Sequence, residues 1–157
     1  MTFDPKLIEA RLALDLIASA DMPSIAIEAL EAGFDGPAIR RLAVLEKPTY
    51  FEVRDVRTRA LEEMRLQEIP AGLASLRLVA QIAKEALVDE STYLRRLYEL
   101  HRLWVKAGYP KESQDAGTLY DDVAIAGFTG QSEEKIREWV RVRLEGLIQQ
   151  AAEAEAE

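Results

Sequence analysis

The sequence contains no cysteine and only one histidine, His101, among its 157 residues. The absence of cysteine excludes thiolate catalysis, iron–sulfur clusters and cysteine zinc sites, and a lone histidine excludes a histidine metal cluster. On the apolar side of a helix, such a histidine is more typical of a hydrogen-bonded core residue than of a catalytic base. Phosphate-binding glycine loops and the Gly-x-Ser-x-Gly motif are also missing. We therefore expect a protein that is not an enzyme and that uses no cofactor.

Long apolar runs are missing as well, since no stretch reaches the roughly 18 residues that a membrane helix requires. The first residues, 1–5, show no basic segment leading into an apolar run, as a secretory signal would. The formal net charge of −8 argues against broad attraction to nucleic acid, which depends on basic surface. These features predict a cytoplasmic protein that binds no membrane.

Apolar residues recur three and four positions apart along almost the whole sequence, and a period of two is never sustained. This pattern predicts an all-α fold, a compact bundle of about eight helices in a single domain over residues 1–150. The remaining segment, 151–157, alternates alanine and glutamate. Its carboxylates oppose the helix dipole at a C-terminus, so we expect a frayed acidic tail.

Several helix ends carry clear local signals. Thr49 and Glu52 have the spacing of a capping box, and Ser132 stands where an N-cap residue would begin the last helix. A helix ending at Ala107 is expected to turn one apolar side to the core, made of Leu94, Leu97, Tyr98, His101, Trp104 and Val105.

Three aromatic residues are candidate anchors for a partner protein. The polar run 109–117 predicts a loop, followed by a short helix over 118–126, and Tyr109 and Tyr120 flank that loop. Trp139 lies beside the apolar stripe of the last helix. Exposed aromatic side chains are common hot spots of protein interfaces, and simple burial is the alternative for each of the three.

Residues 23–46 have the spacing of two helices that cross at a steep angle. Ala29 permits close approach, Gly33 can adopt the left-handed backbone that ends the first helix, and Ile39 and Leu42 pack back onto it. A helix-turn-helix DNA reader has this spacing, and so do many corners of all-helical cores.

The charges at this corner point in two directions. Arg40 and Arg41 lie on the second helix and could contact bases or phosphates, which keeps a DNA-binding regulator as an alternative. Three acidic residues, Glu28, Glu31 and Asp35, crowd the same corner and favour a structural role instead.

A second alternative is enzymatic. Glu28 and Glu31, followed by Glu52 and Asp55, resemble the four carboxylates with which all-helical nucleoside triphosphate pyrophosphohydrolases hold magnesium. The capping box already accounts for Glu52, and an ion pair with Arg59 accounts for Asp55. A magnesium-dependent nucleotide pyrophosphohydrolase is therefore the more remote alternative.

The segments 10–14, 29–33 and 37–43, together with Pro48, resemble the opening of a group of small all-helical bacterial proteins with no assigned activity. The resemblance implies an all-helical fold and a bacterial cytoplasm, and it brings no catalytic residues. With the acidic surface and the lack of a reactive set, we expect a non-catalytic module that binds another protein, of immunity or adaptor type.

Overall fold

The computed structural model describes residues 2–157 and shows an all-α protein. Over these residues the chain forms eight α-helices and three short 3₁₀ helices and no strand, which confirms the predicted fold class. The described residues divide into two compact units, one ending at Ile69 and one beginning at Pro70. Each unit has a buried core of its own, and the single domain predicted over 1–150 stays a prediction.

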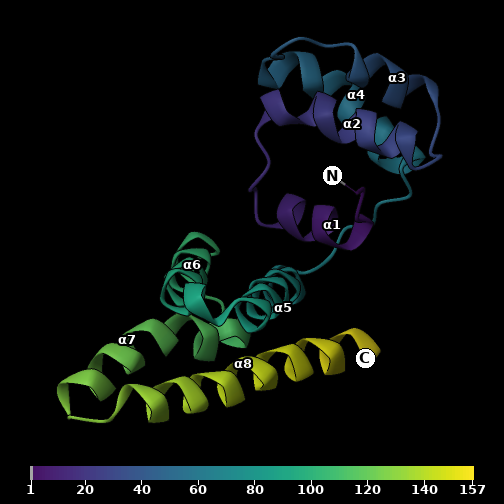
Figure 1. Ribbon diagram of the computed structural model, residues 1–157. Helices are drawn as coiled ribbons and strands as arrows, with labels where there is room; N and C mark the ends of the chain where they lie inside the picture. The colour runs from purple at the N-terminus through teal and green to yellow at the C-terminus, as the bar shows by residue number, and fades with distance from the viewer. Residues whose placement is uncertain (1) are drawn as a thin grey trace. The chain divides into compact units, whose positions relative to one another are not determined.

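Unit 1 packs α2, α3 and α4 into a cluster (Figure 1) and adds α1 to the same core through side chains. Its elements are α1 (Pro5–Ala13), η1 (Ser19–Asp21), α2 (Met22–Glu31), α3 (Pro37–Ala43) and α4 (Tyr50–Glu63). The buried core residues are Phe3, Ile8, Met22, Ala26, Ala29, Ala38, Ile39, Leu42, Val53, Val56, Ala60 and Met64.

Local signals set the helix starts in unit 1. The Asp4 side chain accepts a hydrogen bond from the backbone N–H of Leu7 and so caps α1. Thr49 and Glu52 form the predicted capping box at the start of α4, each side chain accepting from the other residue's backbone N–H. These caps satisfy amides that the first helical turn leaves without partners.

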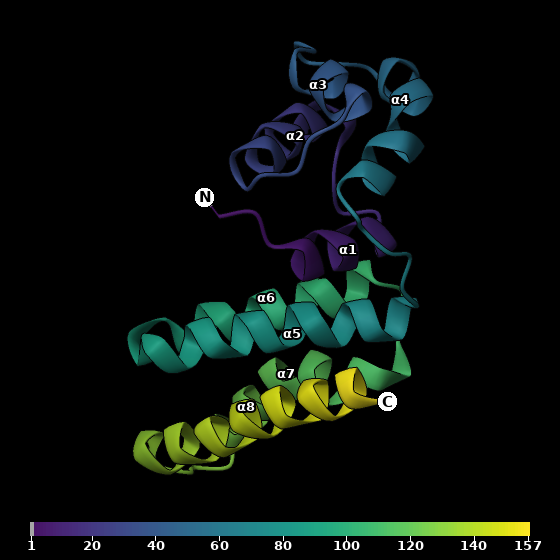
Figure 2. The same ribbon diagram turned by 90° about the vertical axis from the view of Figure 1, so that its right-hand side faces the viewer.

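Unit 2 is a ring of four helices in which α5 packs on α6 and α8, and α7 packs on the same two helices. Figure 2 shows the two layers that result, α5 with α6 and α7 with α8. The elements are α5 (Ala71–Val88), η2 (Glu90–Thr92), α6 (Tyr93–Lys106), η3 (Lys111–Ser113), α7 (Gln114–Phe128) and α8 (Glu133–Ala156).

All four long helices contribute to the core of unit 2. Its buried residues are Val79, Ala83, Ala86, Leu97, Leu100, Ala116, Leu119, Val123, Ile136, Val140, Leu144 and Leu147. Ser132 caps α8 as predicted, its hydroxyl accepting from the backbone N–H of Lys135. Among the described residues, no helix combines the length and the apolar character needed to cross a membrane.

The loop predicted over 109–117 is wrong in its extent. A 3₁₀ turn occupies Lys111–Ser113, and α7 already begins at Gln114. The segment is polar in sequence, but Ser113, Ala116 and Gly117 are buried against neighbouring helices. Tertiary packing therefore extends the helix through residues whose local preference is for a loop.

The acidic segment 151–157 is helical through Ala156. Ala151 is buried in a small cluster with Leu76 and Ala80 of α5, and Glu155 forms an ion pair with Arg77. The predicted fraying is a statement about motion and stays a prediction. The contacts of Ala151 and Glu155 oppose such fraying.

Candidate protein-binding surface

The predicted core side of α6 is wrong for three of its six residues, Leu94, Tyr98 and Val105. Leu97 and Leu100 are fully buried, but Leu94, Tyr98 and Val105 are 51%, 47% and 39% exposed. Successive helical residues differ by about 100°, so these three share one side of α6, adjacent to the buried side. We name Leu94, Tyr98 and Val105 the apolar stripe. The apolar side of α6 is therefore wider than the part of the helix that α5 and α7 cover, and the apolar stripe is the uncovered part.

Five aromatic rings from α6, α7 and the turn that follows α6 lie one after another, and we name them the aromatic row. The Tyr98 ring lies 5.5 Å from that of Tyr120, and Tyr120 lies 6.5 Å from His101. His101 lies 6.5 Å from Trp104, and Trp104 meets the edge of Tyr109 at 5.0 Å. Tyr98 and Tyr109, at the two ends, are exposed, whereas the three rings between them are half-buried. The row is thus a fixed surface with two accessible ends.

Hydrogen bonds and one close contact hold the middle of the aromatic row. Nδ1 of His101 donates to the carbonyl oxygen of Gly117 at 3.0 Å, since a carbonyl can only accept. Nε1 of Trp104 donates to the carbonyl oxygen of Pro110 at 3.1 Å. Gly117 leaves room for the indole, because a Cβ there would lie 2.1 Å from Cδ2 of Trp104. These contacts confirm His101 as a hydrogen-bonded residue at the helix interface.

Basic side chains follow the apolar stripe along the solvent side of α6. Arg95, Arg102 and Lys106 are exposed, and we name them the basic flank. In the part of the chain that the structure describes, no acidic side chain forms an ion pair with any of them. Arg96 differs, because it pairs with carboxylates of α5 and α6. The basic flank is therefore available to a partner.

The three predicted anchors do not share one surface. Tyr109 and Tyr120 both belong to the aromatic row. Trp139 is half-buried on α8, under the guanidinium of Arg143 at 5.6 Å, and lines a cleft of about 420 Å³ between α7 and α8. The sequence pattern did not identify Leu94, Tyr98 and Val105 as surface residues. Their angular distance from Leu97 on a helical wheel is the signal that could have found them.

The corner between α2 and α3 has the predicted backbone. Gly33 has a φ of 97°, and Ala29, Ile39 and Leu42 are fully buried. Phe34, which follows the turn, packs on Phe3 with a ring separation of 5.2 Å. The packing half of the helix-turn-helix pattern is thus present.

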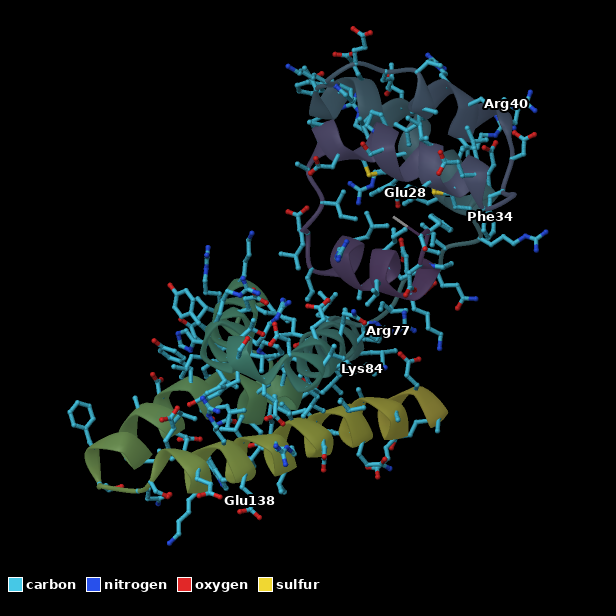
Figure 3. The ribbon with its side chains drawn as sticks, in the orientation of Figure 1. Glu28, Phe34, Arg40, Arg77, Lys84 and Glu138 are labelled. Atoms are coloured by element: carbon cyan, nitrogen blue, oxygen red, sulfur yellow. The ribbon has the colours of Figure 1, made fainter. Side chains whose placement is uncertain are left out.

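One of the two arginines of that pattern, Arg40, has an acidic partner. Arg40 projects from the outer side of α3 (Figure 3) and forms a two-pronged pair with Asp35, at 2.7 Å and 2.5 Å. Arg40 holds the pKa of Asp35 below its ordinary value through this hydrogen-bonded pair. Arg41 is exposed and makes no such pair with the described residues. Of the two arginines, only Arg41 remains available to a phosphate.

Glu63 of α4 closes the start of α3. Its carboxylate oxygens accept the backbone N–H groups of Ala38 and Ile39 at 3.2 Å and 2.9 Å. In a DNA reader, amides at such a helix start are free to meet a phosphate. Here an acidic side chain takes that place, so DNA binding stays a prediction that these contacts do not support.

The four carboxylates of the hydrolase alternative do not assemble into a ligand set. Glu52 is engaged in the capping box, and Asp55 lies 3.6 Å from Arg54 instead of pairing with Arg59. Over residues 2–157, no three acidic or histidine side chains are placed to hold a metal ion. Unit 1 has a cleft of about 560 Å³ between α1 and α4. The acidic residues that line this cleft do not form a group of three that could hold a metal ion either.

No protein-family model, no curated protein and no solved structure matches this chain.

Proposed function

We propose that this chain is a non-catalytic module of a bacterial cytoplasm that binds another protein through the apolar stripe and the aromatic row of unit 2. The observation that carries the proposal is the exposure of Leu94, Tyr98 and Val105 beside a fixed set of rings. Protein interfaces are enriched in aromatic and arginine side chains, and their energetic centres are well-packed aromatic residues within a polar rim. The bacterial cytoplasm is the setting that the resemblance of the first third implies.

The middle of the proposed surface is fixed before a partner binds. The middle rings of the aromatic row are already held by hydrogen bonds to Gly117 and Pro110. Side chains that are fixed before binding lose little conformational entropy when a partner docks. The exposed ends, Tyr98 and Tyr109, can then contribute apolar area and a hydroxyl each.

Of the two types expected from the sequence, the adaptor fits this surface better. An immunity protein that neutralises a basic toxin needs an acidic contact surface. The exposed side chains next to the apolar stripe are instead Arg95, Arg102 and Lys106. The proposal therefore favours an adaptor.

The test is affinity capture from a lysate of the source cells, with identification of bound proteins by mass spectrometry. We expect Leu94→Glu/Val105→Glu to lose the partner, because charge on the apolar stripe opposes desolvation. The matched control is Val44→Glu/Val142→Glu, which adds the same two charges at exposed valines after α3 and on α8. Circular dichroism should show that both variants keep their helices.

Three outcomes decide the proposal. Loss of the partner with the double variant, and retention with the control, supports it. Recovery of the same partner by the double variant overturns the assigned surface. Capture of no specific partner by the unmodified protein overturns the module itself.

A further inference from the structure

We infer that the partner presents an acidic amphipathic helix, which lies along α6 with its apolar side on the apolar stripe and its carboxylates on the basic flank. This inference rests on the proposed function and adds the chemistry of the partner.

The spacing of the apolar stripe favours a helix as the ligand. Leu94, Tyr98 and Val105 lie at positions i, i+4 and i+11 of α6, so they form a line along about three helical turns. A helix laid along such a line meets it with residues at i, i+3, i+4 and i+7. The neighbouring Tyr120 of α7 forms a second wall for that helix, because its ring packs on Tyr98.

The charged residues of α6 indicate that the ligand is acidic. The chain has a net charge of −8, but α6 carries four basic residues and one acidic residue. Three of the four, Arg95, Arg102 and Lys106, are exposed and form no ion pair with the described residues. Complementary charge along one edge steers association and fixes the register of the partner.

The basic charge lies on the α6 side of the proposed surface and not on the α7 side. α7 contains three acidic residues and no basic one. The carboxylates of the partner should therefore lie above α6 and not above α7. This asymmetry would give the bound helix a defined orientation about its own axis.

Two other ligands for a basic amphipathic face fit the surface less well. An anionic membrane requires apolar side chains that can insert, whereas Leu94 and Tyr98 are about half covered by their neighbours, and the net charge of the chain opposes approach. Single-stranded RNA requires free ring faces for its bases. The rings of Tyr98 and Tyr120 already pack on each other.

The experiment measures fluorescence anisotropy of labelled peptides with the full chain. The probe is an amphipathic peptide of about 18 residues with leucines on one face and glutamates on the other. Its twin carries lysine in place of each glutamate. We expect saturable binding of the acidic peptide, at least about tenfold weaker for the lysine twin, and weakening as salt rises from about 50 to about 300 mM.

The matched variants test the basic flank. We expect Arg95→Glu/Arg102→Glu to weaken binding of the acidic peptide by roughly tenfold or more. The control Lys84→Glu/Lys135→Glu makes the same change in net charge at exposed lysines of α5 and α8 and should leave binding within about twofold. Figure 3 labels Lys84 on α5.

Several outcomes would overturn the inference. These are equal binding of the two peptides, equal weakening by both variants, or tighter binding to phosphatidylglycerol vesicles or to single-stranded RNA than to the acidic peptide. A dimer by light scattering that Arg95→Glu/Arg102→Glu dissociates would identify a second copy as the occupant. A cellular partner that is lost with Leu94→Glu/Val105→Glu but retained with Arg95→Glu/Arg102→Glu would overturn the acidic ligand and leave the proposed function intact.

Discussion

Gly117 lies so close to the indole of Trp104 that a Cβ built on it would be 2.1 Å from Cδ2 of the ring. The contact joins α7 to α6 at the middle of the aromatic row. It also explains why a glycine is tolerated inside α7, where its backbone freedom opposes helix formation. The packing of the two helices, and with it the shape of the proposed surface, depends on this missing side chain.

We predict that Gly117→Ala destabilises the protein by about 1 to 3 kcal/mol, because the methyl group forces the indole or the helix to move. Urea unfolding followed by tryptophan fluorescence measures the change. Gly127→Ala is the matched control on the same helix, since a Cβ there meets no atom within 4 Å. The control should be stabilised by up to about 1 kcal/mol through helix propensity. Equal stability of the two variants would contradict the close contact.

A buried hydrogen bond between two serines links α5 to the turn before α7. The hydroxyls of Ser75 and Ser113 are 2.5 Å apart, and both residues are almost completely buried. We predict that either Ser→Ala variant loses about 1 to 3 kcal/mol, because one hydroxyl is left without its partner. The double variant should lose less than the sum, since both polar groups are then gone. Additive losses in the double-mutant cycle would show that the pair is not coupled.

The sequence predicts local structure well where neighbours in the chain determine it. The capping box at Thr49 and Glu52 and the turn at Gly33 depend on residues within one or two helical turns, and both are confirmed. Glu133 and Arg137 lie four residues apart on α8, a spacing that favours an ion pair, and the structure shows that pair.

Contacts between distant helices are what the sequence could not provide. The four-residue spacing of Arg141 and Glu145 on α8 favours an ion pair between them, but Arg141 pairs with Glu90 of η2 instead. The carboxylate of Glu63 reaches the start of α3 from a position 24 residues away. Such partners depend on how the helices pack, and a periodic pattern does not encode this.

The candidate surface shows the same limit. Tyr109 and Tyr120 were identified from the sequence because they flank a polar run. The wide apolar arc of α6 indicates that some of its apolar residues lie outside the core, but the sequence does not tell which ones. Only the positions of α5 and α7 reveal which part of the apolar arc of α6 remains uncovered.

The ion pair between Asp35 and Arg40 should be visible in an NMR titration. Arg40 lowers the folded-state pKa of Asp35, so the pair stabilises the fold above the ordinary aspartate pKa of about 3.9 and loses this contribution as pH falls through the lower folded value. We predict that Arg40→Ala returns the pKa of Asp35 towards its ordinary value. The neighbouring Arg41→Ala is the control and should leave that pKa unchanged. If neither substitution changes the pKa of Asp35, the pair does not persist in solution.

The acidic end of α8 offers a test of whether its contacts outweigh the unfavourable dipole. Glu155 pairs with Arg77, whose side chain is only 11% exposed, and Ala151 is buried nearby. We predict that Glu155→Ala lowers stability by about 1 kcal/mol and speeds amide hydrogen exchange over residues 152–156, because a largely covered guanidinium loses an ionic partner. Glu157→Ala removes a terminal carboxylate and should change neither quantity. If these amides already exchange in the unmodified protein as fast as in an unfolded peptide, the frayed tail expected from the sequence is correct, and the pair with Arg77 does not hold α8 in place.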